Sequence, residues 1–490
     1  MTRLSKKRLL EILPGFMSWN MILFPVWGGY FLPEVTAYFI LTFVVYSVYR
    51  SFTLTIAVVL SHFRIKAAQR MDWMKEVEGF GDWSKTKHVV MIMVASEPEA
   101  VYEETIKNLT EQTFPPRNIV PVLATEERFP AGREGGENLK KKYGKYFDEF
   151  LITVHPKDTP GEIKGKSSNE NWAAREAKRI LVDEKGWDMR FMTITSNDAD
   201  AILDRQYFAY LTFKFLDDPN RYEKFWQPAI MFYKNIWRLP AATRVVNTLS
   251  GIMNLGTLSR KDRLVSFSNY TASLLMVDKV GYWDTDVIPE DYRIFFKAFF
   301  ALGGRVEVDP IYLPSIADAP ESTTTWKTFV NDYQQKKRWA WGVSDLPLFV
   351  MMFSKNYRGS FLNKLLRITK VIEHHLMWPV NWFILTVGAM TASFINPNFQ
   401  RTTIGFLLPR TTSALMSVAL VFLAIMLWVD MAQRPRRPAH VARWRAVLAP
   451  FEFVMMPVVS FFFMALPGLD AHTRLMLGKY LEYRITEKVK

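Results

Sequence analysis

Hydrophobic residues follow two different patterns along the chain, and each pattern predicts a different kind of structure. In the first, apolar residues continue for about 20 positions or more, which is enough to cross a bilayer as a helix. The first such region is interrupted at Pro33-Glu34, so it predicts two spans, and Arg50 would be a costly residue within the second. The expected spans are 14–32 and 36–60 near the N-terminus, and 374–396, 411–432 and 448–467 near the C-terminus.

The path of the last apolar stretch stays open, because Pro457 interrupts it. A complete crossing would carry the basic tail at 468–490 to the outer side of the membrane. A re-entrant hairpin bent at Pro457 would keep that tail inside. The basic N-terminus and the basic loop 433–438 are both expected in the cytoplasm, because short positively charged loops remain there.

In the second pattern, short apolar runs alternate with amphipathic stretches through the middle of the chain. Such alternation is typical of a mostly parallel sheet in an α/β domain, although Pro121 weakens the second run as a strand. Ligands of such sheets bind at the carboxyl ends of the strands. The expected strands are 88–94, 118–124, 150–154 and 189–195, with a helix at 170–181 between the last two.

Composition agrees with a membrane protein that has a folded domain. The 490 residues exceed the usual size of one core, 49% of them are hydrophobic, and the formal charge is +14. Because the Lys and Arg residues flank apolar stretches, they favour a membrane over a nucleic acid as the partner. Cysteine is absent, which excludes disulfides, cysteine–zinc sites and thiol catalysis.

These patterns divide the chain into six segments. Two transmembrane helices precede a basic amphipathic segment of the kind that lies on a membrane surface. The α/β domain follows, and a second basic amphipathic stretch leads into the C-terminal apolar helices. The segments are 1–60, 61–86, 87–342, 343–373, 374–467 (two to three spanning or re-entrant helices) and the tail 468–490.

Asp198 and Asp200 directly follow the predicted strand 189–195. Two carboxylates one residue apart at a strand end can hold a divalent cation and, through it, a diphosphate. The pattern is weak by itself, because a capped helix or a solvated turn gives the same spacing. Asp284 and Asp286 share that spacing but lack the preceding strand, so we interpret them as a false match.

Three further sites carry candidate chemistry. Lys166, in a loop that opens a helix, fits an anion, although without further context a plain cap of Ser and Asn is the commoner explanation. Glu290-Asp291, after Pro289, is placed to supply a general base, with a carboxylate that only caps the helix as the alternative. His374-His375 resembles a metal pair, but its place at the foot of a span favours a role facing the bundle.

A polar and aromatic face is predicted near position 335. Gln335, Arg338 and Trp339 lie at helical spacing and therefore share one side of a helix. Arg binds diphosphate oxygens in a bidentate manner, and Trp packs on the apolar face of a sugar ring. An ordinary amphipathic helix with an inward Trp is the alternative.

In this order, the motifs resemble those of the membrane-integrated family 2 glycosyltransferases, which include cellulose and hyaluronan synthases. Lys166 to Asn171 looks like the family's Lys-x-x-Asn-x-Asn donor segment, and Asp198-Ala-Asp200 looks like its Asp-x-Asp. Glu290-Asp291 looks like part of its Thr-Glu-Asp, and Gln335 to Trp339 like its Gln-x-x-Arg-Trp. The resemblance implies a cytoplasmic GT-A-type, Rossmann-like α/β domain inserted between N-terminal and C-terminal transmembrane helices.

The resemblance also implies a role for each residue. Asp198 and Asp200 would bind Mg²⁺ or Mn²⁺, and Asp291, with Glu290 beside it, would activate the acceptor hydroxyl. Trp339 and Tyr270 would contact the acceptor. The residues expected to contact the donor are Glu97, Glu126, Lys166, Asn169, Asn171, Asp198, Gln335 and Arg338.

The chain departs from the family pattern at three places. Its first strand ends Ala95-Ser96-Glu97 and its second ends Glu126-Glu127, where relatives carry base-binding residues. Pro289 stands where the family has Thr. A UDP-sugar is preferred as the donor by the resemblance, but the first two departures leave a GDP-sugar open.

The sequence therefore predicts an inverting, metal-dependent glycosyltransferase in a plasma membrane, such as a bacterial inner membrane. We expect a processive polysaccharide synthase coupled to export. Transfer of a single sugar to a lipid-linked acceptor is kept as an alternative, because about five spans are few for a polymer channel. A non-catalytic scaffold with a glycosyltransferase-like fold is the other alternative. The expected partners are a nucleotide-sugar, a glycan or lipid-linked acceptor and the bilayer, without nucleic acid.

Overall fold

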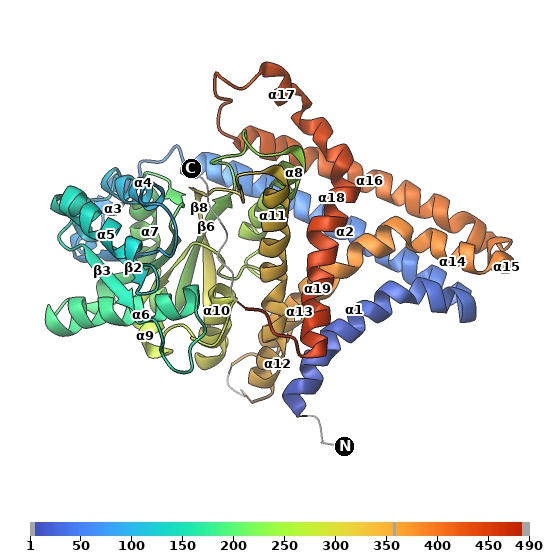
Figure 1. The fold of residues 1–490 in the computed structure, drawn as a ribbon, viewed down its shortest axis with the longest axis horizontal. Helices are drawn as coiled ribbons and strands as arrows, with labels where there is room; N and C mark the ends of the chain where they lie inside the picture. The colour runs from blue at the N-terminus through green and yellow to red at the C-terminus, as the bar shows by residue number, and fades with distance from the viewer. Residues whose placement is uncertain (1–4, 356–358, 483–490) are drawn as a thin grey trace.

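A computed structural model describes residues 5–355 and 359–482 and shows a sheet domain beside a group of long helices (Figure 1). The end of the predicted tail, 483–490, lies outside the described residues. The strands are β1 Lys87–Met93, β2 Ile119–Glu126, β3 Leu151–His155, β4 Met192–Asp198, β5 Ile202–Leu203, β6 Lys224–Met231, β7 Tyr270–Ser273 and β8 Glu307–Ile316.

Helices precede, interrupt and follow the strands along the chain. Those up to the last strand are α1 Lys6–Phe31, α2 Pro33–Ala68, α3 Trp73–Glu78, α4 Glu99–Thr110, α5 Pro130–Tyr143, α6 Lys166–Lys178, α7 Tyr207–Asp217, α8 Ala241–Leu258, α9 Leu274–Lys279 and α10 Glu290–Ala301. Those after it are α11 Thr325–Ala340, α12 Leu346–Lys355, α13 Phe361–Phe383, α14 Ala389–Ile395, α15 Pro397–Gln400, α16 Thr403–Gln433, α17 Arg443–Leu448, α18 Met456–Ser460 and α19 Leu466–Leu477.

The described strands form one sheet in the order β3-β2-β1-β4-β7-β6-β8-β5. Its first four members are parallel, which confirms the predicted α/β sheet, whereas β7 runs antiparallel to both of its neighbours. Pro121 does not break β2, because only β1 flanks the strand at that point and pairing with β3 begins at Val122. The carboxyl ends of β1, β2 and β4 therefore open on one edge.

Both faces of the sheet are buried. Along β1, Met91 belongs to one apolar core and Ile92 to the other, because successive side chains of a strand point to opposite faces. The aromatic side chains of α10 fill the first core, and those of α7 fill the second. A sheet covered on both sides leaves its strand ends as the natural place for a ligand.

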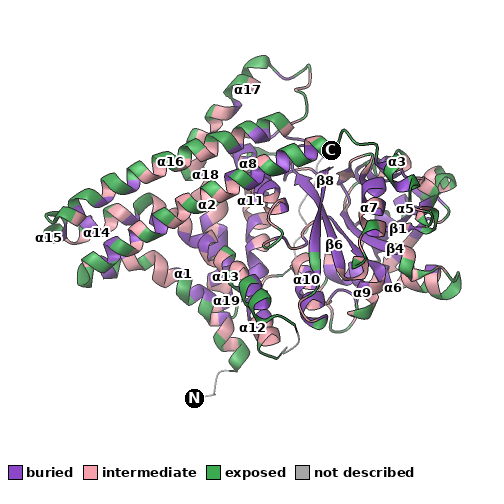
Figure 2. Ribbon diagram, turned by 180° about the vertical axis from the view of Figure 1, so that it is seen from behind, coloured by how far each residue is buried: buried purple, intermediate pink, exposed green. Residues whose placement is uncertain are grey.

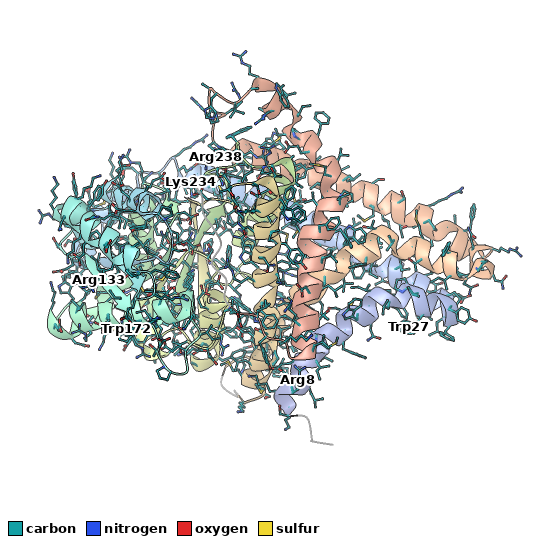
Figure 3. All side chains as sticks on the ribbon, viewed as in Figure 1. Arg8, Trp27, Arg133, Trp172, Lys234 and Arg238 are labelled. Atoms are coloured by element: carbon teal, nitrogen blue, oxygen red, sulfur yellow. The ribbon has the colours of Figure 1, made fainter. Side chains whose placement is uncertain are left out.

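Four long helical segments extend away from the sheet domain: α1, α2, α13 with α14, and α16 (Figure 1). Figure 2 shows that much of their surface is exposed or half-buried, and it is apolar: Phe31 is 70% exposed and Phe394 is 88% exposed. Trp27 likewise lies on the part of α1 that is far from the sheet (Figure 3). Exposed apolar faces of this extent are typical of helices that contact lipid or a partner. Among the described residues, five helical segments are long and apolar enough to cross a membrane.

The helices differ from the predicted segments at their domain ends. The chain turns at Leu32 as expected, but α2 continues to Ala68, so the start of the predicted surface segment is simply the end of α2. Similarly, α13 begins at Phe361, and the basic stretch before residue 374 forms its first turns. Both helices therefore run without a break from the apolar region into the sheet domain.

The last apolar segment, 443–477, is one of the segments that are long and apolar enough to cross a membrane. It passes from α17 to α19 across the base of the long helices and beside α11 (Figure 1). Glu452 pairs with Arg244 of α8 at 2.6 Å, and Asp470 pairs with Lys337 of α11 at 3.2 Å. Charged contacts therefore tie both halves of the segment to the sheet domain.

Candidate active site

A cavity of about 1000 Å³ opens at the carboxyl ends of the central strands and continues between the long helices. It brings together motifs that are more than 200 residues apart in the chain. Of the predicted site residues, those that line it are Glu97, Glu126, Lys166, Asn169, Asp198, Asp200, Glu290, Asp291, Gln335, Arg338 and Trp339.

Asp198 is the last residue of β4, and Asp200 follows in the turn beyond it. The backbone N–H of Asp198 donates to Asn269 Oδ1 at 2.8 Å, and the backbone N–H of Asp318 donates to Asp200 Oδ2 at 3.1 Å. The Asp200 carboxylate is thus held by a backbone N–H, whereas the Asp198 carboxylate accepts from Ser268 Oγ at 3.0 Å. Within 5–355 and 359–482, no group of three or more acidic or His side chains could hold a metal. Two carboxylates plus the phosphates of a substrate match the way Mg²⁺ is usually bound.

Lys166 opens α6 and joins the two groups of carboxylates. Its Nζ lies 3.1 Å from Asp198 Oδ1 and 3.1 Å from Glu290 Oε1. Burial disfavours its charge, but Asp198 and Glu290 outweigh that effect and raise the pKa of Lys166 well above its ordinary value. Burial raises the pKa of Glu290 to about 7 despite the neighbouring lysine. The site therefore holds a permanent cation between Asp198 and Glu290.

Asp291 lies in the first turn of α10, and its orientation is fixed by backbone groups. The backbone N–H of Ser268 donates to Asp291 Oδ2 at 2.8 Å, and that of Tyr292 donates to Oδ1 at 2.8 Å. Ser266 Oγ donates to the Asp291 carbonyl at 2.6 Å. A carboxylate so oriented at the wall of a cavity can accept a proton from a hydroxyl that binds there.

The Gln-x-x-Arg-Trp motif lies on α11, as its spacing predicts. Gln335 Oε1 is buried without a hydrogen-bond partner among the described residues, which is unusual unless a ligand completes it. The ring of Trp339 stacks on Phe232 at 5.9 Å, and Lys336 Nζ lies 3.7 Å from the centre of the indole. Trp339 is therefore a fixed, half-buried platform.

Three residues predicted to contact the donor are held by hydrogen bonds near the ends of the first two strands. Glu97 Oε2 accepts the backbone N–H of Ala95 at 2.7 Å, and Arg128 Nε donates to Glu126 Oε2 at 2.5 Å. Asn169 Nδ2 donates to the carbonyl of Ala124 at 2.8 Å, which ties α6 to the end of β2. All three line the cavity near the strand ends.

Two predicted site residues lie elsewhere, and these predictions need correction. Asn171 is absent from the cavity wall: its Nδ2 donates to the Trp283 carbonyl, and its Oδ1 accepts from Arg175 at 2.8 Å, so both polar ends are used inside the fold. Tyr270 is 1% exposed, and its hydroxyl accepts from Trp283 Nε1 at 2.6 Å. Neither residue is placed to touch a donor or an acceptor.

The two motifs interpreted as false matches have structural roles. Asp284 pairs with Arg293 at 2.9 Å and with Lys297 at 2.7 Å, and it does not line the cavity. His374 and His375 do line the cavity on the bundle side, and the His375 ring lies 6.3 Å from that of Tyr292. Their place agrees with a role facing the bundle.

Two residues at the centre of the site escaped sequence analysis. Ser268 has a positive φ of 55°, which is uncommon for a residue other than Gly, Asn or Asp. That backbone aims its N–H at Asp291, while its Oγ donates to Asp198 Oδ2 at 3.0 Å, so it links the two carboxylates. Asp318 adds another carboxylate to the cavity wall beside Asp200. No local motif marks either residue.

Comparisons with known proteins agree with this site. The model of the family described as "Glycosyl transferase family group 2" matches residues 193–431. No curated protein matches the chain. The matched range runs from β4 into α16 and contains Asp198, Asp291 and the Gln-x-x-Arg-Trp helix.

Two solved structures show a distant likeness. The mannosyltransferase PcManGT from Pyrobaculum calidifontis, in complex with GDP-Man and Mn²⁺, is 13% identical, covers 90% of this chain and 100% of its own, and gives a TM-score of 0.45. GalNAc-T7 with UDP, GalNAc and Mn²⁺ is 13% identical, covers 60% of this chain and 59% of its own, and gives a TM-score of 0.35. The family match identifies residues 193–431 as a glycosyltransferase domain of family group 2, and the mixed sheet with carboxylates at its edge has a GT-A-like arrangement.

Proposed function

We propose that the protein transfers a sugar from a nucleotide-sugar to the hydroxyl of an acceptor at a membrane, with inversion at the anomeric carbon. The observation that carries the proposal is the single cavity that joins the strand-end carboxylates to the Gln-x-x-Arg-Trp helix and then to the apolar helices. A donor enters most simply from the sheet edge, because the nucleotide is polar. An acceptor enters most simply from the helices.

The charges at the sheet end support a divalent metal as the cofactor. Asp198, Asp200, Glu290, Asp291 and Asp318 all line this part of the cavity, and such a wall repels a diphosphate unless cations intervene. Mg²⁺ or Mn²⁺ held by Asp198 and Asp200 would neutralise the departing nucleotide diphosphate. Glu97 and Glu126, where the chain departs from its family pattern, would determine whether UDP or GDP is the carrier.

The other residues would orient the two substrates. Lys166 and Arg338 would bind diphosphate oxygens, and the unsatisfied Gln335 Oε1 would accept a hydrogen bond from the donor. Asp291 would take the proton of the acceptor hydroxyl as that oxygen attacks the anomeric carbon. Trp339 would lie under the acceptor sugar.

A processive polysaccharide synthase is the second candidate function. The observation in its favour is that the cavity continues among the long helices, where Trp378, Asn381 and Trp382 line it. Aromatic and amide side chains are suited to hold a growing glycan. The length of the product made by the purified protein from labelled donors separates a polymerase from an enzyme that adds one sugar.

Basic residues around the long helices support a cytoplasmic position for the sheet domain. Arg8 at the start of α1, the loop 433–438 and the start of α17 all lie at the sheet-domain end of these helices (Figures 1 and 3). Positively charged connections of this kind stay inside the cell. The far ends, at Leu32 and α15, would face the outside.

Replacing Asp291 by Asn tests the proposal. The substitution removes the base while keeping the shape of the side chain, so we expect sugar transfer to fall by about 10²- to 10⁴-fold with donor binding retained. Radiolabelled transfer and equilibrium binding of the nucleotide-sugar measure the two effects. Asp286→Asn is the matched control, because Asp286 is 67% exposed and does not line the cavity. Unchanged transfer by the Asp291 variant would refute the proposal.

A further inference from the structure

The inner end of the cavity, between α2, α8 and α13, has a chemistry unlike that of the sheet end. Basic side chains dominate its wall, and one carboxylate, Asp262, accompanies them. We call these residues the inner basic cluster. Its basic members are Arg50, Arg260, Arg263, Arg367 and Lys370.

Ion pairs within the protein leave this cluster with excess positive charge. One carboxylate, Glu373, serves two arginines: it lies 3.2 Å from Arg50 Nε and 3.0 Å from Arg263 Nη2. Asp262 pairs with Lys370. In the described parts of the chain, the Arg260 guanidinium, which is half-buried at the cavity wall, has no ion-pair partner. Buried positive charge of this kind favours an anionic ligand.

The depth of the cluster corresponds to the level of lipid head groups. Arg50 lies 17 residues after Pro33 at the outer start of α2, so it is about 26 Å along that helix. The outer ends of the helices meet where Asn396 Nδ2 donates to the Gly29 carbonyl at 3.4 Å. Because a hydrocarbon core is about 30 Å thick, Arg50 lies close to the inner boundary of the bilayer. Arg260 and Arg263, beyond the end of α8, extend the cluster into the sheet domain.

Next to the cluster, the cavity wall becomes apolar as it enters the long helices. An occupant of this region would have its charge among the arginines and a hydrocarbon chain along α13, α16 and α18. The apolar side chains that line this part are Leu54, Trp378, Trp382, Leu385, Met416, Leu420, Met456 and Met464.

We propose that the inner basic cluster binds the phosphate of a membrane lipid whose head group carries the acceptor hydroxyl. This inference rests on the proposed transferase function and names its acceptor class. The cluster is close to the base in the chain, because Arg263 precedes Ser266, whose Oγ donates to the Asp291 carbonyl at 2.6 Å. With its phosphate at the arginines, such a lipid presents its sugar hydroxyl toward Asp291 and Trp339.

The transfer then balances without any further reactant. The head-group hydroxyl oxygen forms the new bond to the anomeric carbon, and the bond from that carbon to the nucleotide diphosphate breaks. The proton of the hydroxyl passes to Asp291, and the nucleotide diphosphate leaves with the bonding electron pair. The phosphate of the lipid is unchanged, because it serves only to hold the acceptor.

A pair of acceptors that differ in one phosphate tests the assignment. Farnesyl phosphate carrying a sugar and the farnesyl glycoside of the same sugar are compared, with glucose, mannose and N-acetylglucosamine as the sugars, on the full chain in detergent. We expect the phosphate-bearing acceptor to have a KM at least about tenfold lower, as for a charge-assisted contact. Arg260→Gln should raise that KM by about tenfold and thereby remove most of the preference.

Controls distinguish this inference from the proposed function. Arg305→Gln is the matched variant, because Arg305 is 67% exposed on the sheet domain and pairs with Glu223. It should leave the preference intact. Metal-dependent nucleotide release with equal KM values for the two acceptors would overturn the lipid assignment and leave the transferase proposal standing. Phosphatidylglycerol vesicles that compete with both acceptors alike would reveal a site for bulk lipid only, which also overturns it. No nucleotide release from any donor would overturn both.

Discussion

The two ends of the cavity are built in different ways. At the sheet end, the carboxylates of Asp200 and Asp291 accept backbone N–H groups, and the Asp198 carboxylate accepts from Ser268 Oγ. At the inner end, the charged groups are long side chains from separate segments, and Arg50 and Arg263 both pair with Glu373. The sheet end is therefore rigid in its backbone, whereas the inner end depends on how the helices pack.

This difference matches the separate tasks that we propose for the two ends. Transfer requires reacting groups to be positioned closely, which backbone contacts at strand ends supply. Holding a lipid requires charge at the correct depth and apolar surface beside it, but less exact geometry. Substitutions at the sheet end should lower the rate of transfer, whereas substitutions toward the helices should mainly weaken binding of the acceptor.

Trp339 lies between the two ends and is the strongest probe of that separation. Trp339→Leu keeps an apolar side chain but removes the flat surface, so the KM for the acceptor should rise by about tenfold to a hundredfold with donor affinity unchanged. Initial rates over an acceptor series measure it. Trp326→Leu, on the same helix but 74% exposed, is the control and should change neither constant. A loss of donor affinity in the Trp339 variant would show that the two tasks are not separate.

Lys336, beneath Trp339, should give a smaller and pH-dependent effect. Burial lowers the pKa of this lysine to about 7. In the unfolded chain the pKa of Lys336 returns to about 10.5, so the unfolded state binds more protons than the folded state between about pH 7 and about pH 10.5. The free energy of unfolding should therefore rise with pH across that window. Lys336→Met should flatten this rise and raise the acceptor KM by about two- to tenfold, because the amine no longer supports the indole ring. Thermal unfolding at several pH values and acceptor kinetics measure the two effects.

The matched control for this prediction is Lys327→Met, which removes an exposed amine from the same helix. It should leave the slope of stability against pH unchanged. An equal slope in the wild type and in the Lys336 variant would mean that the buried amine stays charged throughout. The orientation of Trp339 would then need another support, of which Phe232 is the available one.

Sequence was sufficient for the sheet end, because its signals are local. An apolar run followed at once by Asp198 and Asp200, or a helix start at Glu290-Asp291, can be recognised within a few residues. The predicted ends of the first four strands lie within a few residues of the observed ones. By contrast, β5, β6, β7 and β8 were not recognised, although they form half of the strands in the described sheet.

The inner end could not be predicted, because its meaning depends on contacts between distant segments. Arg260 and Arg263 look like an ordinary basic turn in sequence, and only the packing of α8 against α2 places them beside Arg50. The predictions for Tyr270 and Asn171 were wrong for the opposite reason. Their sequence context suggested a site, but their polar groups form hydrogen bonds with Trp283 inside the fold. Hydropathy likewise does not reveal the ion pairs that join 443–477 to α8 and α11.

The central claim is that the carboxylate-rich end of the cavity carries out metal-dependent sugar transfer, and metal removal tests it most directly. The purified full chain is incubated with UDP- and GDP-sugars, and released nucleotide is measured after treatment with EDTA and again after excess Mn²⁺ or Mg²⁺ is added. We expect release from at least one donor to fall to background with EDTA and to return with the metal. Asp198, Asp200 and the diphosphate are all negatively charged, so a cation is needed between them. Release that continues undiminished in EDTA would contradict the account.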